Sequence, residues 1–92
     1  MKGITVSDFI NNLYSNCDME FLYKNNRYMI ESWVDRDEIY SIRMFEISAN
    51  CPVLFSVCNK DRAICVNAFE GAKLFDGKTI FEIDDEITVE YS

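Results

Sequence analysis

Histidine is absent from the 92 residues of the chain. It is the commonest general base near neutral pH and the commonest metal ligand in proteins. Its absence excludes a Ser-His-Asp triad and a Cys-His pair. Only three glycines are present, and they form no phosphate-binding motif. We therefore predict a protein that is not an enzyme and that holds no metal and no cofactor.

Basic residues are scarce as well. Nine lysines and arginines stand against 16 aspartates and glutamates, for a net charge of −7. Nucleic-acid binding depends on basic side chains that neutralise phosphates, so direct contact with nucleic acid is disfavoured. Binding to an anionic membrane is disfavoured for the same reason. By charge, the expected partner is a basic protein surface.

Long apolar runs are missing too. No stretch approaches the roughly 20 residues that span a bilayer, and residues 1–17 do not resemble a signal peptide. We expect a cytoplasmic protein with no membrane association. Hydrophobic residues nevertheless make up 49% of the chain, and only one proline occurs. That composition predicts a single compact domain over residues 1–92.

The four cysteines, at positions 17, 51, 58 and 65, are widely spaced. Structural zinc sites usually pair cysteines two to four residues apart. The spacing therefore favours free, mostly buried thiols over a metal site or disulfides.

The first part of the chain predicts a helix followed by a hairpin. Between residues 5 and 17, apolar residues recur at helical spacing, and Thr5 or Ser7 can cap the start. Residues 19–31 contain two aromatic-rich runs separated by Asn25 and Asn26, which is typical of a β-hairpin. Residues 32–38 form a charged connection, and we expect Trp33 within it to be a core residue rather than an exposed anchor.

Two strands and a second helix are predicted next. Residues 39–47 read as a strand with apolar residues on both faces, which indicates cover on both sides or contacts in a dimer. Residues 53–58 are short and apolar, so we expect a central strand. Asn59 is the expected cap of a helix that starts near Asp61.

The chain closes with a turn and a strand. Asp76 and Gly77 mark a turn. Residues 78–83 fit either a helical turn or a strand, and residues 87–91 read as a half-buried strand. The predicted fold class is α+β in the order α-β-β-β-β-α-β. It is a mostly antiparallel sheet of about four to five strands, with two helices on one face.

Charge is concentrated near the C-terminus. Residues 81–92 contain no lysine or arginine, and they hold five acidic residues: Glu82, Asp84, Asp85, Glu86 and Glu90. One interpretation is an edge strand kept from aggregating by charge. The other is a docking surface for a basic partner, as in an inhibitor, an immunity protein or a nucleic-acid mimic. We take the second as the leading functional hypothesis: a small acidic, non-catalytic interaction protein.

Two alternatives stay open. The first is a structural or oligomerising domain, such as a homodimer, suggested by the apolar residues on both faces of residues 39–47. The second is a small-molecule-binding domain whose pocket is lined by four aromatic side chains: Tyr23, Tyr28, Trp33 and Tyr40.

Overall fold

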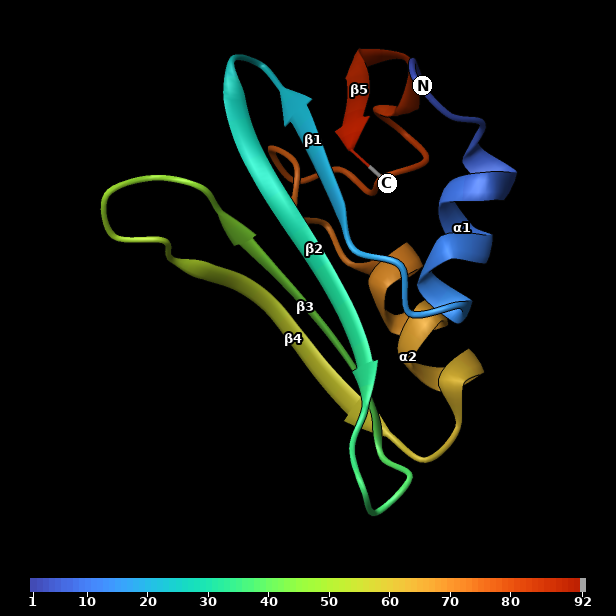
Figure 1. Ribbon diagram of the computed structural model, residues 1–92. Helices are drawn as coiled ribbons and strands as arrows, with labels where there is room; N and C mark the ends of the chain where they lie inside the picture. The colour runs from blue at the N-terminus through green and yellow to red at the C-terminus, as the bar shows by residue number, and fades with distance from the viewer. Residues whose placement is uncertain (92) are drawn as a thin grey trace.

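The computed structural model describes residues 1–91; Ser92, the last residue of the predicted domain, lies outside the described residues. Its helices are α1 (Val6–Tyr14), α2 (Arg62–Gly71) and a single 3-10 turn, η1 (Asp84–Glu86). Its strands are β1 (Met19–Tyr23), β2 (Asn26–Val34), β3 (Tyr40–Glu46), β4 (Val53–Asn59) and β5 (Ile87–Tyr91). This order confirms the predicted α+β arrangement (Figure 1).

All five strands belong to one antiparallel sheet in the order β4-β3-β2-β1-β5. The first four strands follow one another as a meander. The fifth returns to the other side of β1, so that β4 and β5 are the two edges. Both helices lie on the same face of the sheet, as predicted, and no part of residues 1–91 forms a layer over the opposite face (Figure 1).

Helix α1 begins at Val6, directly after its N-cap residue Thr5. The Thr5 hydroxyl accepts a hydrogen bond from the Asp8 amide at 3.0 Å, and Asp8 places a negative charge in the first turn. Phe9 and Leu13, one turn apart, bury the apolar stripe. The helix ends at Tyr14, so Cys17, which we expected inside it, lies beyond the end.

The first hairpin forms as predicted, with its turn one residue earlier. Tyr23 pairs with Asn26, which leaves Lys24 and Asn25 as the turn residues. Their φ values are 47° and 65°, and a type I′ turn requires positive φ at both central positions. Strand β2 then runs on through Trp33, so the predicted charged connection is confined to the turn that follows Val34.

The core lies between the sheet and the layer that covers it. Alternate residues of the strands point inward, for example Met19 and Phe21 on β1. Aromatic rings link the layers. The ring centroid of Phe9 on α1 lies 6.2 Å from that of Phe21 on β1 and 6.2 Å from that of Phe69 on α2. These rings join helix to sheet and helix to helix, which makes one continuous core.

Helix α2 and the segment after it complete the covering layer. The Asp61 carboxylate accepts from the Ala63 amide at 2.9 Å and is the N-cap. Asn59, the predicted cap, instead accepts a hydrogen bond from the Asp61 amide at 2.9 Å. Residues 72–83 form turns, so residues 78–83 are neither helix nor strand. The buried side chains of Phe75 and Ile80 fasten this segment to the sheet.

Three expectations about burial are wrong. Trp33 is 40% exposed, on the uncovered face of the sheet rather than in the core. Strand β4 is an edge strand rather than a central one, because β5 joins the sheet beside β1 and no strand within residues 1–91 is added beyond β4. The cysteines are free, but only Cys65 is buried, while Cys51 and Cys58 are exposed and Cys17 is intermediate.

Candidate functional site: an acidic turn and an uncovered sheet face

The five acidic residues near the C-terminus have different environments. Glu82 helps to build a turn: its carboxylate accepts from the Thr79 amide at 2.9 Å, and its own amide donates to the Thr79 hydroxyl at 3.3 Å. The hydrogen bond from the Thr79 amide lowers the pKa of Glu82. This carboxylate is therefore engaged in local structure.

Glu90 is also engaged. It lies on β5 and pairs with the Arg27 guanidinium at 2.5 Å, while the same guanidinium holds Glu20 of β1 at 2.9 Å. The bond with Glu90 raises the pKa of Arg27. One arginine of β2 therefore joins three neighbouring strands on the uncovered face. The charge of Glu90 is partly neutralised there.

The remaining three acidic residues form the turn η1, which we call the acidic turn: Asp84, Asp85 and Glu86. None of them has an ion-pair partner within residues 1–91. Asp85 and Glu86 are exposed, and Asp84 is half-buried. The buried side chains of Ile83 and Ile87 hold the turn on both sides. The predicted acidic surface thus reduces to a fixed turn with about three uncompensated charges.

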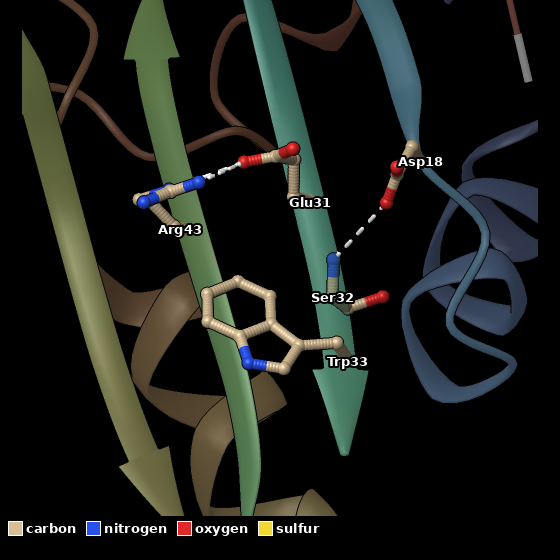
Figure 2. Close-up of a pocket in the computed structure, with 5 residues that line it drawn as sticks. All are labelled: Asp18, Glu31, Ser32, Trp33 and Arg43. Atoms are coloured by element: carbon tan, nitrogen blue, oxygen red, sulfur yellow. Dashed lines mark hydrogen bonds and ion pairs between the residues drawn. The ribbon is translucent and has the colours of Figure 1, made fainter. Parts of the chain in front are cut away.

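A second feature lies on the uncovered sheet face, near the end of β2. Arg43 of β3 pairs with Glu31 of β2 at 2.6 Å, and its guanidinium carbon lies 5.4 Å from the ring centroid of Trp33. These side chains surround a hollow of about 230 Å³ together with Ser32 and Asp18. Figure 2 shows Arg43 and Glu31 meeting above the indole ring, with Asp18 directly before the neighbouring strand β1.

The hollow is not the aromatic pocket that the sequence suggested. Tyr23, Tyr28 and Tyr40 are buried on the opposite, covered face of the sheet, and Trp33 alone borders the hollow. The structure therefore does not bring the four aromatic side chains together. Ligand pockets usually measure about 300–1,000 Å³, so this hollow is also small for a cofactor-sized molecule.

The sequence does contain a signal for the exposed tryptophan. On β2 the side chains of Arg27 and Glu31 share a face with Trp33, because alternate residues of a strand point the same way. Because Arg27 and Glu31 are charged, the face of β2 that they share with Trp33 is expected to face water. The contact with Arg43 could not be found this way, since it depends on the register between β2 and β3.

No group of three or more metal-ligating side chains occurs among residues 1–91, and no helix in that range is long and apolar enough to cross a membrane. No protein-family model matches the chain, and comparison with curated proteins and with solved structures produced no match either.

Proposed function

We propose that this chain is a small acidic, non-catalytic interaction protein that docks on a basic protein surface through its acidic turn. The observation that carries the proposal is the set of uncompensated carboxylates at Asp84, Asp85 and Glu86, held by buried neighbours. Charges that lack internal partners remain available to a partner, and a fixed turn loses little conformational entropy on binding.

The partner's chemistry follows from the same charges. Lysine or arginine side chains on the partner would face three carboxylates, and complementary charge of this kind mainly accelerates association. A protein that normally binds nucleic acid presents such a basic surface. An inhibitor or antagonist that occupies that surface is the specific form of the proposal.

The test compares two triple variants that each change the net charge from −7 to −4. The first neutralises the acidic turn: Asp84→Asn, Asp85→Asn and Glu86→Gln. The second, a matched control, neutralises the turn between β2 and β3: Asp35→Asn, Asp37→Asn and Glu38→Gln. The two turns lie at opposite ends of the molecule (Figure 1).

Partners are captured from an extract of the source cells, eluted with a salt gradient and identified by mass spectrometry. The association rate of the purified partner is then measured by surface plasmon resonance. We expect about a tenfold slower association for the acidic-turn variant at low salt, and little change for the control. Equal association of both variants, or capture of no partner, would contradict the proposal.

A further inference from the structure

The two edges of the sheet differ in their backbone hydrogen bonding. At the β5 edge, the N-terminal segment adds backbone hydrogen bonds: the Lys2 amide donates to the Ile87 carbonyl, and the Val89 amide donates to the Lys2 carbonyl, both at 2.9 Å. At the β4 edge, no segment of residues 1–91 pairs with the strand on the side away from β3. One edge is therefore covered and the other is open.

The open edge has only part of the usual protection against strand pairing. The register between β3 and β4 shifts by one residue at Leu54, near the start of β4, and the rest of the strand pairs regularly. Edge strands are commonly guarded by charged side chains, proline or bulges that twist them away. Strand β4, with the sequence VLFSVCN, contains no charged residue and no proline over seven residues. Each of the other four strands carries at least one charge. In a chain of net charge −7, the open edge is the uncharged strand.

Apolar side chains of β4 are left incompletely covered on both faces. Val53 and Leu54 are 55% and 41% exposed. Phe55 and Val57 pack against the core but remain half-buried. The ring of Phe55 lies 5.7 Å from that of Phe69 on α2, which holds the strand in place. The edge is thus ordered, extended and apolar.

We propose that β4 is a self-association edge, on which a second copy of this chain adds its own β4 antiparallel across a two-fold axis. An antiparallel strand paired with itself is self-complementary, so the contact closes at a dimer. With the axis at the central residue of the strand, Ser56 faces the partner's Ser56. Phe55 then faces the partner's Val57. The result is a continuous ten-stranded sheet.

The uncharged strand suits a second copy as the occupant. Two molecules that each carry −7 repel one another least where the contact surface itself holds no charge, and β4 provides that strand. The acidic turn lies beside β5, at the opposite edge of the sheet. Dimerisation would leave it free, so this inference and the proposed docking function can each fail independently.

Sedimentation velocity over about 1 μM to 1 mM protein tests the inference, a range that covers weak to moderate association. We expect a concentration-dependent monomer–dimer equilibrium that tightens with added salt, because salt screens the repulsion between the copies. The exposed Ser56 is the position to alter. Ser56→Lys places two lysines opposite each other at the axis, and Ser56→Asp places two aspartates there.

Each variant alone should weaken dimerisation on the order of fivefold or more, because like charges directly opposite destabilise a strand pair. An equimolar mixture of the two should restore association, since lysine then faces aspartate. Asn67→Lys on the exposed side of α2 makes the same charge change as Ser56→Lys away from the edge and should leave the dimer intact. Circular dichroism verifies that each variant folds.

Three results would overturn the inference. A monomer throughout the concentration range would show that the edge does not self-pair. A dimer unaffected by either Ser56 variant would place the contact elsewhere. A mixture that associates no better than the separate variants would show that the two strands do not meet at this residue.

Discussion

Asp76 shows how one side chain connects distant parts of this small fold. It lies in the turn after α2 with φ of 55°. Its carboxylate accepts hydrogen bonds from the Lys24 ammonium at 2.9 Å and the Tyr23 hydroxyl at 3.0 Å. The bond from Lys24 is the main cause of the lowered pKa of Asp76, followed by the bond from Tyr23. The turn of the first hairpin is thereby tied to the segment that precedes β5.

This lowered pKa predicts a pH dependence of stability. A carboxylate with a depressed pKa in the folded state contributes its full stability at pH values above its pKa in the unfolded chain. For Asp76 that ordinary pKa is 3.8. That contribution disappears as the pH falls through the folded value. We expect Asp76→Asn to lower the free energy of unfolding at neutral pH, with the deficit shrinking as the medium is acidified. Asparagine tolerates positive φ, so the turn itself is preserved.

Urea unfolding between about pH 2 and 7 measures the effect. Asp85→Asn removes the same charge from a side chain that forms no ion pair within residues 1–91, and it controls for net charge. A deficit of Asp76→Asn that is constant across the whole pH range would mean that the ionised carboxylate does not supply the stability.

At the scale of elements, the N-terminal segment guards the β5 edge, and Gly3 makes this possible. Gly3 has φ of 87°, and a Cβ built on it would lie 2.1 Å from the Val89 carbonyl oxygen. Any other residue would therefore meet both backbone strain and a collision with the strand. Gly71, at the end of α2, has no atom within 4 Å of its would-be Cβ and no positive φ.

The two glycines predict opposite effects of one substitution. Gly3→Ala should lower the free energy of unfolding by about 1–3 kcal/mol and detach the N-terminal segment from β5. Gly71→Ala should raise it by up to about 1 kcal/mol, because alanine restricts the unfolded chain without a clash. Urea unfolding measures both changes. Hydrogen exchange should show faster exchange of the Val89 amide in Gly3→Ala alone, and unchanged protection there would refute the role of Gly3.

Elements could be predicted better than their arrangement. The cap at Thr5 and the turn at Asp76 depend on neighbouring residues, so they could be found by local reasoning. The place of β4 could not, because an apolar run reads alike in a central strand and in an unguarded edge strand. Its position depends on where β5 inserts, some thirty residues later in the chain.

For the whole molecule, charge is poorly balanced. Of 16 acidic residues, four form ion pairs within residues 1–91: Glu20, Glu31, Asp76 and Glu90. Net charge far from zero destabilises a folded protein through self-repulsion. Exposed ion pairs add little stability in return. Repulsion should therefore outweigh attraction among the surface charges.

It follows that added salt should stabilise the protein. At about 0.5 M sodium chloride the Debye length falls to a few ångströms, so repulsion is screened and the melting temperature should rise by several degrees from its low-salt value. Thermal unfolding followed by circular dichroism measures this. The acidic-turn variant, with net charge −4, should respond less than the wild type. A melting temperature that falls with salt would show that the ion pairs dominate.

The sequence by itself determined the element order, the antiparallel class and the excess of negative charge, because periodicity, capping and composition are local or additive properties. Only the tertiary structure decided which carboxylates stay uncompensated, that Trp33 faces water and that β4 is an open edge. Those outcomes depend on strand register and on contacts between residues far apart in the chain. Arg27 illustrates the reason: it meets Glu90 only because β1, β2 and β5 come together in one sheet.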